Sequence, residues 1–167
     1  MKIAKILILL TLVFSAYNSF AQNVFEYEFD KNISINVLED SEEGELPDGK
    51  FVRGVFDNEV FTFSSSNKAK DKAGTINEIV KLFQGVRDGN LKSLKGTLLN
   101  EETINRNDVK TFKYQIYFQI EGQKKILESY VFVYKNTLYM LQFINNEIEF
   151  EKLNTFRKSI VETVIFN

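Results

Sequence analysis

The chain has 167 residues, a formal net charge of −2, and neither cysteine nor histidine. This length suits a single domain, and the mildly acidic balance argues against nucleic acid or an anionic membrane surface as the partner. Without cysteine or histidine the usual zinc sites, haem ligation and histidine-based triads cannot be built, so we expect no cofactor of these kinds.

Residues 1–21 have the order of a secretory signal peptide. Two lysines precede an apolar run from Ile6 to Phe14, and Ser19-Phe20-Ala21 offers a small-x-small cleavage site. The run is too short for a membrane-spanning helix. We therefore expect an exported protein, periplasmic or extracellular, with no membrane span after cleavage. It would not be a lipoprotein, because no cysteine follows the cleavage site to carry the lipid.

Residues 22–167 contain no repeat or low-complexity linker, so we predict one domain. The first half alternates apolar and polar residues, which is typical of strands with one buried face. The predicted elements are a hairpin of strands at 25–29 and 33–37, a polar loop at 39–50 with a turn at Pro47-Asp48-Gly49, and a second hairpin at 51–64 that turns at Asp57-Asn58.

The period then changes to that of a helix over residues 75–88. Apolar residues from Ile76 to Val86 fall on one helical stripe. Thr75 and Glu78 have the spacing of a capping box, and Asp88-Gly89 predicts the end of the helix. A strand at 94–103 is predicted to follow.

Three strong strands and a closing helix complete the predicted domain. They lie at 112–120, 126–133 and 138–144, and the helix covers 146–164 with Asn146 and Glu149 as its capping pair. The second and third strands are apolar on both faces, so both faces must be covered. The predicted fold class is therefore α+β, with an antiparallel twisted β-sheet covered by helices on both faces in an α/β/α sandwich.

This order of elements resembles the PsbP-like superfamily, which includes the photosystem II extrinsic protein, a Ran-binding import factor and small exported bacterial proteins. The resemblance rests on Phe51–Ser64 leading into Thr75–Arg87, on the three strands above, and on Phe156-Arg157-Lys158-Ser159-Ile160 in the closing helix. It covers most of residues 23–166 and carries no diagnostic motif. It implies a non-catalytic adaptor or binding domain, and some periplasmic immunity proteins look similar in fold.

Six acidic residues lie within the predicted loop at 39–48. Glu39, Asp40, Glu42 and Glu43 begin this cluster, and Glu45 and Asp48 complete it. The cluster fits a solvated loop, but calcium favours several oxygen ligands, and a basic partner protein would also be attracted. The regular spacing of an EF-hand is absent, so a metal site at these four residues is only the weaker alternative.

A second candidate contact lies on the strand at 112–120. Lys113 and Tyr117 are on its polar side together with Gln115 and Gln119. Tyrosine is enriched at protein interfaces, so Lys113 and Tyr117 are candidate partner-binding residues.

We therefore expect an exported, non-enzymatic binding or adaptor domain that acts on another protein of the cell envelope or on a secreted protein. One alternative is a periplasmic immunity protein that neutralises a toxin through the acidic cluster. Another is a small calcium-binding protein or a hydrolase that uses carboxylates. No residue is predicted to be catalytic.

Overall fold

The structure is a computed structural model that describes residues 24–69 and 75–167. The predicted signal peptide lies outside these ranges. Within them, no helix is both long and apolar enough to cross a membrane. In chain order the elements are β1 (Val24–Asp30), β2 (Ile33–Leu38), β3 (Glu42–Leu46), β4 (Gly49–Phe56), β5 (Glu59–Ser66), η1 (Asn67–Ala69), α2 (Ile76–Leu94), β6 (Thr97–Arg106), β7 (Val109–Ile120), β8 (Gln123–Tyr134), β9 (Thr137–Asn146), α3 (Glu147–Phe150), η2 (Glu151–Leu153), α4 (Asn154–Glu162) and β10 (Ile165–Phe166).

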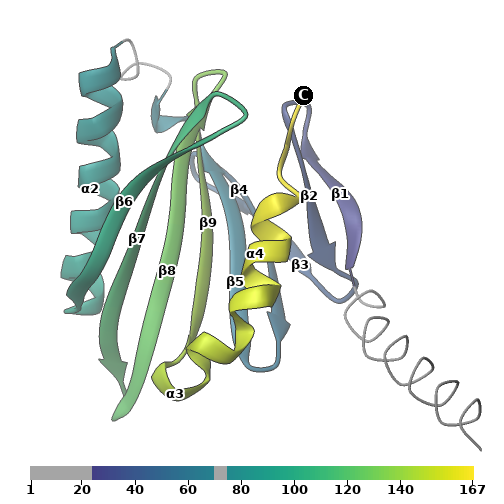
Figure 1. The fold of residues 1–167 in the computed structure, drawn as a ribbon. Coiled ribbons are helices and arrows are strands. Elements are labelled where there is room, and N and C mark those ends of the chain that lie inside the picture. The colour runs from purple at the N-terminus through teal and green to yellow at the C-terminus, as the bar shows by residue number, and fades with distance from the viewer. Residues whose placement is uncertain (1–23, 70–74) are drawn as a thin grey trace, which may run out of the picture.

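The strands form two sheets in which all neighbours pair antiparallel. The larger sheet has seven strands in the order β3-β4-β5-β9-β8-β7-β6, and the smaller has three in the order β1-β2-β10. Figure 1 shows the twist of the larger sheet, with α2 packed on β7 and β8 and with α4 next to β2. The predicted hairpins and the three long strands are all present.

Tight turns join the long strands. Asp57-Asn58 and Lys135-Asn136 both have positive φ, which is the conformation that a two-residue hairpin turn requires. Asn107-Asp108 forms a third turn of the same kind, so β6 runs beyond the predicted end of its strand, to Arg106. Together with Glu121-Gly122 between β7 and β8, the last two of these turns keep consecutive strands adjacent in the order β9-β8-β7-β6.

Helix α2 begins as predicted and ends later than predicted. The side chain of Thr75 accepts a hydrogen bond from the backbone of Glu78, whose carboxylate accepts one from the backbone of Thr75. The predicted stop at Asp88-Gly89 is wrong, because the helix continues to Leu94 and closes at Lys95 in the left-handed conformation. The apolar stripe of α2 continues past Gly89 as far as Leu94. The packing of this stripe therefore outweighs the local stop signal of Asp88-Gly89.

The predicted polar loop at 39–50 is wrong in part, since β3 occupies its centre. Gly44 of β3 pairs with Phe51 of β4, and the turn at Pro47-Asp48 joins the two strands as predicted. β3 is an edge strand of the larger sheet, and its glutamates are exposed. Strands are recognised in a sequence by alternating apolar and polar residues, and a strand with no packed apolar face lacks this alternation. For this reason β3 was not predicted.

The predicted single helix at 146–164 is instead three short helical segments, α3, η2 and α4. Asn146 makes no side-chain cap, so the predicted capping pair is wrong. The backbone N–H of Asn154 bonds to the carbonyl oxygen of Glu151, and the carbonyl oxygen of Phe150 instead accepts a hydrogen bond from Arg157 at 2.6 Å. This side-chain bond replaces a helical one and separates α3 from α4. The chain ends in β10, which pairs with β2.

Two apolar cores lie against the larger sheet because its strands alternate their side chains. Leu127 and Val131 of β8 join the core that contains α2, whereas Tyr130 and Phe132 join the core that contains α4. In the α2 core, Phe83 stacks on Phe112 with ring centroids 5.9 Å apart. The prediction that β8 and β9 are buried on both faces is confirmed.

An antiparallel α+β fold is confirmed, but the sandwich with helices on both faces is not. The core that contains Phe156 and Ile160 of α4 also contains Phe29, Ile33 and Ile35 of the smaller sheet. The cover on that side is therefore a short helix together with β1 and β2. The alternation of apolar and polar residues predicted β1 and β2 as strands. It did not indicate that these two strands belong to a separate sheet.

Candidate functional site

The four acidic candidate residues lie at one edge of the larger sheet. Glu39 and Asp40 are in the turn after β2, and Glu42 and Glu43 follow on β3. Neighbours on a strand point to opposite faces, and accordingly Glu42 sits opposite Arg53 while Glu43 accepts a hydrogen bond from the Tyr27 hydroxyl. These acids therefore do not converge. In the described ranges, no group of three or more acidic side chains is placed to hold a metal ion.

The carboxylate of Glu43 also affects its partner. Burial, which is the largest cause, acts together with the hydrogen bond to Glu43 and the negative charge of Glu43 to raise the pKa of Tyr27 to about 12. Tyr27 therefore stays protonated and keeps donating at physiological pH. This contact ties β1 of the smaller sheet to β3 of the larger one.

Two hollows adjoin the acidic turn. One of about 300 Å³ is lined by Glu39, Asp40 and Val55 together with Leu38 and Phe56. The other, of about 310 Å³, shares Asp40 and Val55 with the first and adds Glu42, Arg53 and Gly54. Val55 is 51% exposed, so both hollows combine acidic side chains with an exposed apolar one, and Arg53 adds a positive charge to the second.

Lys113 and Tyr117 lie near the other edge of the sheet, on β7. Four strands separate β7 from β3, so the structure does not bring these two residues together with the acidic candidates. Register places Asn100 and Glu102 of β6 directly beside Gln115 and Lys113. We call the side chains of Asn100, Glu102, Lys113, Gln115, Tyr117 and Gln119 the polar face; all six are exposed or half-buried.

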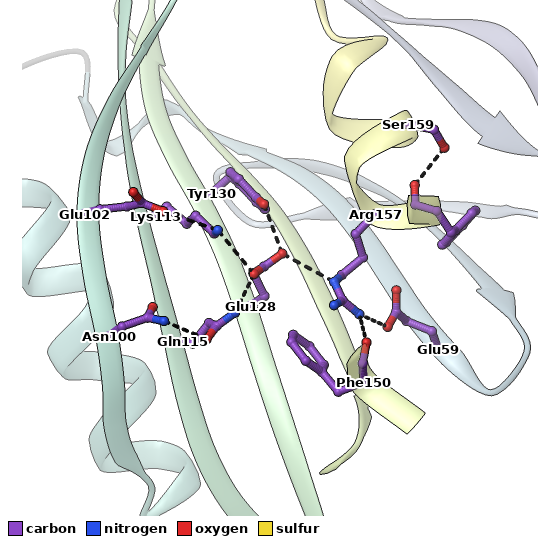
Figure 2. A network of polar contacts seen from close by, with 11 residues as sticks. Glu59, Asn100, Glu102, Lys113, Gln115, Glu128, Tyr130, Phe150, Arg157 and Ser159 are labelled. Atoms are coloured by element: carbon purple, nitrogen blue, oxygen red, sulfur yellow. Dashed lines mark hydrogen bonds and ion pairs between the residues drawn. The ribbon is translucent and has the colours of Figure 1, made fainter. Parts of the chain in front are cut away.

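The side chains of the polar face are held by one another. Asn100 donates to Gln115 at 2.8 Å, and Gln119 donates to the Tyr117 hydroxyl at 3.2 Å. Lys113 Nζ lies 3.3 Å from a carboxylate oxygen of Glu102. Each contact spans neighbouring strands or adjacent positions on the same face, so the sheet fixes the arrangement. Figure 2 shows the contacts of Asn100 with Gln115 and of Glu102 with Lys113.

Glu128 of β8 joins the polar face to the core. Its carboxylate accepts hydrogen bonds from Gln115 Nε2 at 2.6 Å and from the Tyr130 hydroxyl at 2.9 Å. Lys113 Nζ lies 3.6 Å from the same group. Burial is the main cause that raises the pKa of Tyr130, and the negative charge of Glu128 adds to it, so this hydroxyl remains a donor.

Arg157 of α4 lies at the buried end of this network. Its side chain is 1% exposed, and Nη1 donates to Glu59 of β5 at 2.8 Å. Nε lies 3.4 Å from a carboxylate oxygen of Glu128, and the guanidinium stacks 3.6 Å from the ring centre of Phe150. Figure 2 shows Arg157 between the two carboxylates, which ties α4 to both β5 and β8.

Glu59 has the most perturbed carboxyl group of the network. It is fully buried, and burial is the largest cause that raises its pKa to about 7. The charge and hydrogen bond of Arg157 and the amide of Asn145 act in the opposite direction, while the charge of Glu128 raises the pKa again. Glu59 therefore changes its charge near neutral pH.

Sequence reasoning named Lys113 and Tyr117 as candidates, and it did not point to the buried network of Glu59, Glu128 and Arg157. A signal was present for two of the three. Arg157 falls three residues before Ile160, on the apolar stripe of the closing helix, and Glu128 lies in the predicted strand at 126–133, which is otherwise apolar or aromatic apart from Ser129. A charge at a core position is expected to have a buried partner.

No protein-family model and no curated protein matches the sequence. Among solved structures, the chain is similar to cyanobacterial PsbP from Synechocystis, with a TM-score of 0.63 and 9% identity over 87% of this chain and 93% of that one. It is also similar to PA94 from Pseudomonas aeruginosa, a protein of unknown function, with a TM-score of 0.57 and 10% identity over 87% of this chain and 98% of that one.

A third similar structure comes from Bacteroides thetaiotaomicron, with a TM-score of 0.54 and 13% identity. The match covers 87% of this chain and 48% of that one. At these identities the likeness concerns the fold alone. This likeness in fold agrees with the order of elements that gave the PsbP-like resemblance in the sequence. The chain therefore has a PsbP-like fold.

Proposed function

We propose that this protein is an exported, non-enzymatic binding domain that contacts another envelope or secreted protein through its polar face. The observation that carries the proposal is the fixed arrangement of exposed and half-buried polar side chains on β6 and β7. Lys113 is held between Glu102 at 3.3 Å and Glu128 at 3.6 Å, and Gln115 is held between Asn100 and Glu128. Side chains that are already ordered lose less entropy when a partner binds.

The composition of the polar face supports a protein as the partner. Tyr117 offers a large amphipathic side chain, of the kind enriched at interfaces, and it lies among amide groups that can donate and accept. Three titratable groups do contact one another: Glu59, Glu128 and Arg157. They are buried against one another and stabilise the fold rather than carry out a reaction. A non-catalytic role is the simplest use of this arrangement.

Export is the second part of the proposal, and it rests on the signal peptide pattern of residues 1–21. The test is amino-terminal sequencing of the protein recovered from its own cells. We expect the mature chain to begin at Gln22 and to be found outside the cytoplasm. A cytoplasmic protein that retains Lys2 and Lys5 would contradict this part of the proposal.

The contact surface is tested with Tyr117→Ala in the mature protein. The partner is first captured from the envelope fraction and identified, and its affinity for each variant is then measured with purified proteins. We expect Tyr117→Ala to weaken binding at least tenfold, as for an interface tyrosine. The matched control is Gln84→Ala, on the exposed side of α2, which should bind as the native protein does.

A second candidate function is neutralisation of a basic toxin by the acidic turn and β3. The hollows beside Val55 favour it, because a lysine or arginine could place its stem on Val55 and its charge beside Asp40 and Glu42. Replacing Glu39, Asp40 and Glu42 by their amides separates the two proposals. It should abolish binding to such a toxin and leave binding through the polar face unchanged.

A further inference from the structure

The two carboxylates that share Arg157 are unequally satisfied. Glu128 accepts hydrogen bonds from Gln115 and Tyr130 in addition to its contact with Arg157. Glu59 has one oxygen, Oε2, bonded to Arg157 at 2.8 Å, whereas Oε1 is buried and has no hydrogen-bond partner. A buried carboxylate oxygen without a donor strongly disfavours the charged form of the group.

The balance of charges also makes Glu59 the surplus anion. Three carboxylates share two cations, Lys113 and Arg157, so one negative charge of the network has no cation of its own. A charged Glu59 adds a third negative group, and it is the one most removed from water, with no exposed surface. With a proton on Glu59 the five groups together are neutral.

Of the groups in the described ranges that shift the pKa of Glu59, Arg157 is the only cation. β9 contributes the side-chain amide of Asn145, whose Nδ2 makes no hydrogen bond, and α3 contributes the carbonyl of Phe150, which is bonded to Arg157. β8 contributes Tyr130 as a neutral donor to Glu128. Arg157 is therefore the link through which a change of charge at Glu59 reaches α3 and α4.

We propose that Glu59 is a proton-binding site, and that the proton it takes up as the pH falls strengthens the docking of residues 147–164 on the larger sheet. Protonated Glu59 still accepts from Arg157 through Oε2, so the contact between β5 and α4 survives. The raised pKa of about 7 agrees with this role and places the change near neutrality. The inference does not depend on the proposed binding function.

The sign follows from proton binding by the folded and unfolded states. The pKa of Glu59 is raised from 4.5 in the unfolded chain to about 7 in the folded one, so the folded state binds more protons between these values. The stabilising effect is complete below the unfolded value and is lost as the pH rises through the folded one. From pH 5.5 to pH 8 the unfolding equilibrium constant should rise roughly 25-fold on account of this group.

The experiment uses the mature chain, Glu59→Gln as an isosteric neutral variant, and Glu26→Gln, on the exposed side of β1 and outside the network, as the control. Unfolding equilibrium constants are measured by denaturant titration from pH 5.5 to pH 8. We expect Glu59→Gln to remove the rise of roughly 25-fold and Glu26→Gln to retain it. A rise that persists undiminished in Glu59→Gln would overturn the proposal.

Two measurements on the unaltered chain keep the proposal testable if Glu59→Gln does not fold. The ¹³C shift of the Glu59 carboxyl group should titrate near pH 7, and a midpoint near 4.5 would refute proton binding. Hydrogen-exchange protection of residues 147–164, corrected for intrinsic rates, should fall above neutral pH more than that of β7 and β8. A uniform fall across the chain would refute the link to α3 and α4.

Discussion

Replacing Arg157 by methionine tests how much the buried network contributes to stability. Methionine keeps most of the length of the side chain and its contact with the ring of Phe150, but it removes the positive charge. Two buried carboxylates, Glu59 and Glu128, then lose their shared partner. Removing one partner from a buried ion pair typically costs about 3–5 kcal/mol, because the remaining charge is neither hydrated nor paired.

A matched control separates burial from the ion pair itself. Lys152 of η2 lies 2.8 Å from Glu149, the same distance as that between Arg157 and Glu59, but the Lys152 side chain is 65% exposed. Exposed pairs contribute about 0–1 kcal/mol. We therefore expect Lys152→Met to change the free energy of unfolding by less than about 1 kcal/mol.

The assay is denaturant unfolding of both variants and the native chain at pH 8, where Glu59 is mostly charged, and at pH 5.5. The loss caused by Arg157→Met should be smaller at pH 5.5, because protonated Glu59 no longer needs a cation. If Arg157→Met and Lys152→Met destabilise the protein equally, the reasoning about burial is refuted. Equal losses at the two pH values for Arg157→Met would refute the role given to Glu59.

Four further predictions concern α2 and the start of β4, and all are checked by the midpoint of denaturant unfolding. Gly85 lies inside α2, where an added Cβ meets nothing within 4 Å, so Gly85→Ala should stabilise the protein by about 0.5–1 kcal/mol. Gly49→Ala should destabilise it instead, because the new Cβ would lie 2.0 Å from the carbonyl oxygen of Ser65. Phe83→Ala should cost about 3–5 kcal/mol as a buried aromatic lost from the α2 core, and an unmoved midpoint would show that α2 is not docked. Thr75→Ala removes the amino-terminal cap of α2 and should cost about 1 kcal/mol, whereas no change would mean that the cap is dispensable.

Local patterns in the sequence were enough for the elements that pack an apolar face. The alternation through β7, β8 and β9 and the stripe that contains Phe83 reflect burial directly, so these elements follow from composition and spacing. The start of α2 was also predictable, because the capping box of Thr75 involves only residues three apart. Its end was not, because the packing of the last turn outweighs Asp88-Gly89.

The features that sequence reasoning missed depend on partners distant in the chain. β3 is a strand because Gly44 and its neighbours pair with β4, although no apolar residue alternates there. Arg157 divides α3 from α4 because Glu59, 98 residues earlier, holds its guanidinium beside the carbonyl oxygen of Phe150. Lys113 was identified by its polar strand face alone, but its place in a network that reaches the core required the fold.

The measurement that tests the central claim most directly is hydrogen exchange of the mature protein with and without its captured partner. The account predicts that binding slows exchange in β6 and β7, which carry the polar face, and leaves exchange in β3 unchanged. Slowed exchange confined to β3 and the acidic turn before it would contradict the account and assign binding to the opposite edge of the sheet.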